Sequence, residues 1–73
     1  MARKIFIGDL SATTTETTLE AAFDNFGTIV ALSIDPTPMG HIEYSSDAEG
    51  DAAIAAMDGA TLDGSVITVG EER

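Results

Sequence analysis

The segment "KIFIGDL", residues 4–10, decides the fold class because its branched aliphatic residues occupy alternate positions. Ile5 and Ile7 fall on one side of an extended chain, whereas Lys4, Phe6 and Gly8 fall on the other. A period of two predicts a β-strand with one buried face.

A helix is expected after this strand. Thr15 is a suitable N-cap, and Glu16 would lie at the positive end of the helix dipole. Gly27 is expected to end the helix. The apolar residues that recur at helical spacing are Leu19, Ala22, Phe23 and Phe26.

Two further strands follow. "TIVALSI", residues 28–34, is rich in branched aliphatic residues, and "DPTP", residues 35–38, ends it because proline cannot donate to a strand ladder. "MGHIEY", residues 39–44, alternates again and predicts a third strand. Its inward side chains are Ile42 and Tyr44, and its outward ones are Met39, His41 and Glu43.

Ser46 predicts the start of a second helix, with Gly59 as its end. Gly50 lies inside this helix, where glycine costs about 1 kcal/mol against alanine unless close packing requires it. "ATLDGS", residues 60–65, predicts a turn, and "VITV", residues 66–69, predicts a fourth strand with Val66 and Thr68 pointing outward.

The resulting order, β-α-β-β-α-β, predicts an α+β, ferredoxin-like domain over residues 1–73. Both helices would cover one face of a four-stranded antiparallel sheet and leave the other face open. The open face should display Lys4, Phe6, Ser33, Met39, His41, Glu43, Val66 and Thr68.

Composition narrows the possible functions. The chain has no cysteine, and its single histidine has no plausible nucleophile beside it in the sequence, so we expect no enzyme, no cofactor and no metal site. Asp47, Glu49 and Asp51 resemble the opening of a calcium loop, but Ala52 replaces the required glycine. No apolar run is long enough to span a membrane, and we expect a cytoplasmic protein.

The formal net charge of −10 comes from 13 acidic residues against Arg3, Lys4 and Arg73. Such a charge is consistent with solubility or with adaptation to high salt. A cationic partner is the functional alternative.

Three segments resemble the RNA-recognition-motif family. "IFIGDL", residues 5–10, is similar to the short signature of that family, although Asp9 replaces the preferred asparagine. "LEAAFDNFGTI", residues 19–29, and "DAAIAAMDGATLDGSVITV", residues 51–69, are similar to its helices and last strand. The resemblance implies an open sheet face on which RNA bases stack against aromatic side chains.

The longer signature of the family is degenerate in this chain. "TPMGHIEY", residues 37–44, keeps the structural positions Gly40, Ile42 and Tyr44. Thr37 replaces a cation, Pro38 a glycine, and Met39 and His41 the two stacking aromatics. The loop before it, usually long and basic, is shortened to "DPTP".

The resemblance therefore implies weak binding of single-stranded RNA by a monomer. The implied RNA-binding residues are Phe6, His41, Met39, Lys4, Arg3 and Arg73. In this fold the first strand begins beside the end of the fourth, so the three cations should gather at one sheet edge. The alternatives are a protein-interaction module that meets a basic partner, and a recharged scaffold that has lost RNA binding.

Overall fold

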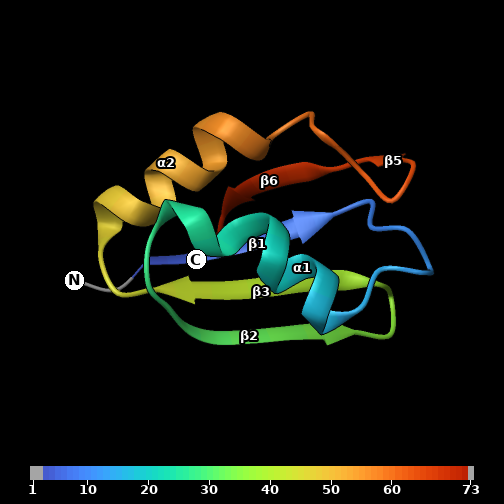
Figure 1. The fold of residues 1–73 in the computed structure, drawn as a ribbon, viewed down its shortest axis with the longest axis horizontal. Helices are drawn as coiled ribbons and strands as arrows, with labels where there is room; N and C mark the ends of the chain where they lie inside the picture. The colour runs from blue at the N-terminus through green and yellow to red at the C-terminus, as the bar shows by residue number, and fades with distance from the viewer. Residues whose placement is uncertain (1–2, 73) are drawn as a thin grey trace.

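A computed structural model describes residues 3–72 as a four-stranded antiparallel sheet with two α-helices over one face (Figure 1). The strand order is β2-β3-β1-β6, with a separate two-stranded hairpin, β4-β5. The elements are β1 (Arg3–Gly8), α1 (Glu16–Phe23), the 3₁₀ helix η1 (Asp24–Phe26), β2 (Ile29–Asp35), β3 (Met39–Tyr44), α2 (Asp47–Met57), β4 (Thr61–Leu62), β5 (Ser65–Val66) and β6 (Thr68–Glu71). The predicted α+β, ferredoxin-like fold is confirmed.

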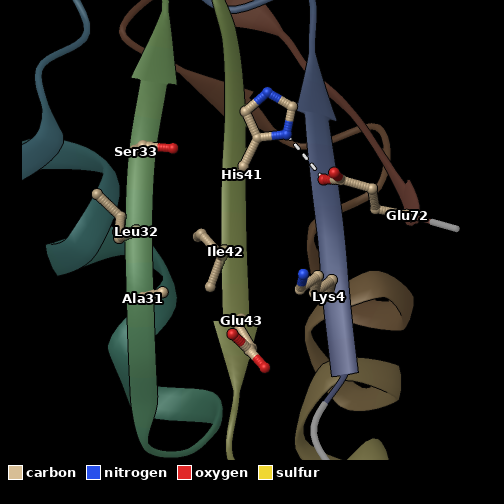
Figure 2. Close-up of a pocket in the computed structure, with 8 residues that line it drawn as sticks. All are labelled: Lys4, Ala31, Leu32, Ser33, His41, Ile42, Glu43 and Glu72. Carbon is tan, nitrogen blue, oxygen red and sulfur yellow. Dashed lines mark hydrogen bonds and ion pairs between the residues drawn. The ribbon is translucent and has the colours of Figure 1, made fainter.

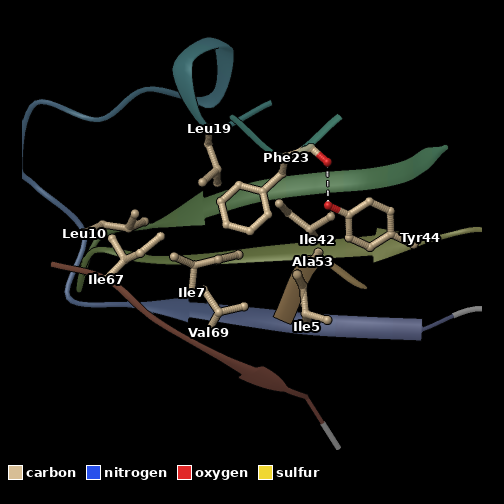
Figure 3. Packing of buried hydrophobic residues seen from close by; sticks show 10 residues of the cluster. All are labelled: Ile5, Ile7, Leu10, Leu19, Phe23, Ile42, Tyr44, Ala53, Ile67 and Val69. Atoms are coloured by element: carbon tan, nitrogen blue, oxygen red, sulfur yellow. Dashed lines mark hydrogen bonds between the residues drawn. The ribbon is translucent and has the colours of Figure 1, made fainter. Parts of the chain in front are cut away.

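The core lies between the two helices and the sheet, and it includes the inward side chains of the strands (Figure 3). Its buried residues are Ile5, Ile7, Leu10, Leu19, Phe23, Ile42, Tyr44, Ala53, Ile67 and Val69. Tyr44 is fully buried and its hydroxyl donates a hydrogen bond of 2.6 Å to the carbonyl oxygen of Phe23. Burial raises the pKa of the Tyr44 phenol, because the phenolate would lose its hydration.

The predicted helix starts are confirmed, but the first helix ends earlier than expected. Thr15 and Thr18 cap α1 reciprocally, and the Ser46 hydroxyl accepts from the backbone N–H of Glu49 at the start of α2. The α-helical part of the first helix ends at Phe23, and a 3₁₀ turn carries the chain to Gly27. Phe26 consequently packs at the margin of the core.

The fourth strand differs from the prediction. Asp63 and Gly64 both adopt positive φ, at 50° and 84°, as two-residue hairpin turns require. Ser65–Val66 therefore pairs with Thr61–Leu62, and the sheet strand begins only at Thr68. The expectation that Val66 lies on the open sheet face is wrong, because this residue belongs to the hairpin.

Two buried glycines allow the helices to approach the sheet. A Cβ atom at Gly40 would lie 2.9 Å from Cδ2 of Leu19, and one at Gly50 would lie 2.2 Å from Cγ of Arg3. Close packing therefore explains the glycine inside α2. Among residues 3–72, no helix has the length and apolar character needed to cross a membrane.

Candidate nucleic-acid interface

Phe6 occupies the centre of the open face. On β1 it stands opposite His41 of β3 on one side and Gly70 of β6 on the other. The ring lies directly over Gly70, where an added Cβ atom would stand 2.9 Å from Cε1 of Phe6. The glycine thus leaves room for the half-buried aromatic ring.

His41 is held between two carboxylates. Its Nδ1 lies 2.7 Å from Oε1 of Glu72, and its Nε2 lies 3.0 Å from Oδ2 of Asp35 (Figure 2 shows the Glu72 contact). These contacts raise the pKa of His41, with the Asp35 hydrogen bond as the largest cause and that of Glu72 next. A neutral imidazole can donate only one proton, so the imidazolium form satisfies both acceptors.

Asp35 also organises the turn between β2 and β3. Its Oδ1 accepts from the backbone N–H groups of Thr37, at 2.9 Å, and Met39, at 3.0 Å. The same oxygen accepts from the Thr37 hydroxyl. The hydrogen bonds from Thr37 first, and then that from His41, lower the pKa of Asp35. Only residues 36–38 separate the two strands.

Two shallow hollows flank His41. One, of about 250 Å³, lies over β2 and β3 and has Lys4, Ser33, His41, Glu43 and Glu72 as its polar lining (Figure 2). The other, of about 460 Å³, is lined by Phe6, Met39, His41, Glu71 and Glu72. The structure thus brings Phe6, Met39 and His41 together around one hollow. Lys4 lines the other hollow, and His41 and Glu72 border both.

Of the three predicted cations, Arg3 and Lys4 point to opposite faces of the sheet. Arg3 lies beside the end of β6, but its guanidinium points to the helix side of the sheet, because alternate strand residues face opposite ways. There it pairs with Asp47, Asp51 and Glu71 at 3.6, 3.4 and 2.7 Å. Arg3 and Lys4 thus lie at the start of β1, beside the end of β6, but Arg3 does not share the open face with Lys4. Arg73 lies outside the described residues.

Lys4 is exposed on the open face and makes no ion pair within residues 3–72. Asp9, directly after β1, adopts a φ of 61°, which aspartate and asparagine tolerate better than most residues. Its carboxylate accepts a 2.8 Å hydrogen bond from the Thr68 hydroxyl. Over the same described range, no group of three potential ligands could hold a metal ion.

Sequence reasoning missed the two partners of His41. Asp35 carried one signal, since an aspartate at the start of a turn commonly accepts from backbone N–H groups two residues on. Glu72 carried none, because only the sheet register brings it beside a residue 31 positions away.

Comparison with known proteins places the chain in a family. The family model for the RNA recognition motif matches residues 5–68. RbpA of Nostoc sp. is 38% identical, over 94% of this chain and 74% of RbpA. Glycine-rich RNA-binding protein 1 of Mycosarcoma maydis is 34% identical, over 94% of this chain but only 43% of that protein.

The fold comparison agrees. The second RRM domain of yeast poly(U)-binding protein (Pub1) superposes with a TM-score of 0.84 at 22% identity, covering 97% of this chain and 94% of that domain. The family is non-enzymatic, which agrees with the expectation from the sequence. From the match over residues 5–68 and the shared sheet topology, we conclude that this chain belongs to the RNA recognition motif family.

Proposed function

We propose that this chain binds single-stranded RNA weakly, by stacking bases on the open face of its sheet. The observation that carries the proposal is the position of Phe6, whose half-buried ring borders the hollow of about 460 Å³. Stacking on one aromatic ring contributes about 1–3 kcal/mol per base. Residues 3–72 offer one such ring at the centre of this face.

His41 and Met39 complete the stacking surface. His41 takes the place of one aromatic of the family's longer signature, and its ring is fixed by carboxylates at both nitrogens. An imidazolium ring can stack on a base while its nitrogens stay engaged. Met39 supplies polarizable apolar contact in place of the second aromatic. In this proposal the degenerate longer signature still contacts bases, but with fewer aromatic rings.

Electrostatics keep the affinity low. Most nucleic-acid affinity comes from neutralised phosphates. Lys4 is the one lysine or arginine that residues 3–72 offer on the open face, and the charge of the His41 imidazolium is already paired with Asp35 and Glu72. The short turn at residues 36–38 carries no cation. We propose that the net charge of −10 repels the RNA backbone at low salt, so that raising the salt concentration weakens binding less than for a basic domain.

The negative charge also favours a second function, binding of a basic protein by this one domain acting as a monomer. The two functions differ in their dependence on Phe6. RNA stacking requires its ring, whereas contacts made by the acidic helices do not.

An NMR amide titration with a pool of short single-stranded RNAs, at low and at high salt, tests the primary proposal. We expect shifts at Phe6, His41 and their strand neighbours that persist at high salt. Phe6→Ala should abolish them while leaving the rest of the spectrum dispersed. An absence of shifts at millimolar RNA under both salt conditions would contradict the RNA proposal and favour the protein partner.

A further inference from the structure

The hollow beside Phe6 is mostly apolar, and its ionisable lining other than His41 consists of carboxylates. Phe6 and Met39 contribute apolar surface, and both ring nitrogens of His41 are engaged by carboxylates. Glu71 directs its Oε1 to Arg3 at 2.7 Å, toward the helix side. The polar group left for a ligand in this hollow is the carboxylate of Glu72.

Glu72 has unused acceptor capacity. Its Oε1 contacts Nδ1 of His41, and its Oε2 makes no hydrogen bond within residues 3–72. An ionised carboxylate offers about four lone-pair sites and no donor. Its contact with His41 fixes the carboxylate at the edge of the hollow, so a base stacked on Phe6 meets an acceptor-only group.

We propose that this hollow selects bases that present adjacent N–H donors, with guanine first and uracil last. This inference rests on the RNA-binding function proposed above. Guanine carries N1–H and N2–H side by side, and the two can donate to one carboxylate in a bidentate pair. Uracil offers a single N–H between two carbonyl oxygens, which a carboxylate repels. Adenine and cytosine each offer one amino group, so we expect their affinity to lie between those of guanine and uracil.

Stacking alone cannot supply this selectivity, because every base has a π-face and stacking is sequence-tolerant. The edge contact with Glu72 is therefore the specificity-determining interaction. Lys4, which could donate to carbonyl oxygens, lines the other hollow, over β2 and β3. It does not offset the preference at Phe6.

The test uses the 73-residue chain and four RNA pentamers, pentauridine and its variants with guanine, adenine or cytosine at the centre. Dissociation constants are taken from NMR amide titrations. We expect the guanine pentamer to bind roughly tenfold more tightly than pentauridine, as one bidentate base contact allows. Glu72→Gln, which replaces one acceptor oxygen by a donor, should bring this ratio close to one while the Phe6 shifts persist.

Glu43→Gln is the matched control, because it removes the same charge from the same face but lines only the hollow over β2 and β3. It should leave the guanine preference intact. Equal affinities for the four pentamers would overturn the inference while RNA binding stands. An equal loss of preference in both variants would also overturn it, since the effect would then be one of charge alone. No binding by any pentamer would overturn both proposals.

Discussion

Phe6 lies over Gly70, so close that a Cβ atom at position 70 would stand 2.9 Å from Cε1 of the ring. The two residues are direct neighbours on β1 and β6. Gly70 therefore determines where the ring can lie, and the stacking surface depends on a residue that has no side chain.

Gly70→Ala should displace the Phe6 ring without unfolding the domain, because the nearest atoms belong to the outer part of that ring. We expect weaker RNA binding than in the unchanged chain, with a smaller loss than Phe6→Ala, which removes about 1–3 kcal/mol of stacking. Amide titration with the guanine pentamer and thermal unfolding measure the two effects. Unchanged affinity would show that the ring position is not critical.

The stability of the fold should depend on pH through His41. Its pKa is raised above the ordinary value of 6.5, first by Asp35 and then by Glu72. A raised pKa means that the folded state binds the proton more tightly, so this stabilisation is complete below pH 6.5 and is lost as the pH rises through the folded-state pKa. Urea unfolding between about pH 5 and pH 9 should show the loss in the unchanged chain.

His41→Gln is the control, because it keeps a polar side chain that does not titrate. Its free energy of unfolding should vary less over the same range. At the acidic end the sign reverses, since the lowered pKa of Asp35 gives a stabilisation that is present above 3.8 and lost as the pH falls. Identical profiles for both proteins above pH 5 would contradict the imidazolium bridge.

Gly50→Ala should destabilise the domain although alanine is the better helix former. An added Cβ atom would lie 2.2 Å from Cγ of Arg3, and overpacking of this kind typically costs about 1–3 kcal/mol. Ala52→Gly, at an exposed position of the same helix, reports the intrinsic propensity difference of about 1 kcal/mol. Chemical unfolding of both variants tests the packing, and a more stable Gly50→Ala protein would show that Arg3 can move away freely.

Tyr44→Phe should lower the free energy of unfolding by about 1 kcal/mol, because it leaves the Phe23 carbonyl without its 2.6 Å hydrogen bond. Urea unfolding of the variant measures the loss. RNA affinity should not change, since Tyr44 points into the core on the opposite side of the sheet from Phe6. An altered affinity would indicate that the core hydrogen bond also positions the open face.

Periodicity along the chain determined which side of each strand is buried. Ile5, Ile7, Ile42 and Tyr44 face the helices as their spacing predicts, because alternate side chains of a strand point to opposite faces. The N-caps at Thr15 and Ser46 could likewise be predicted from the sequence, since they depend on hydrogen bonds between residues three apart. The same alternation, applied to Arg3 and Lys4, predicts that these two side chains point to opposite faces of the sheet.

Other features arose only from tertiary structure. The strand predicted at "VITV" divides because Asp63 and Gly64 close a hairpin that takes Ser65 and Val66 away from the sheet. Glu72 reaches His41 because the sheet register joins segments that are distant along the chain. The sequence by itself thus determined the buried faces of the first and third strands and the starts of both helices, which depend on local spacing. Only the tertiary structure decided which charged groups meet on those faces, because such contacts depend on register between segments that no local pattern connects.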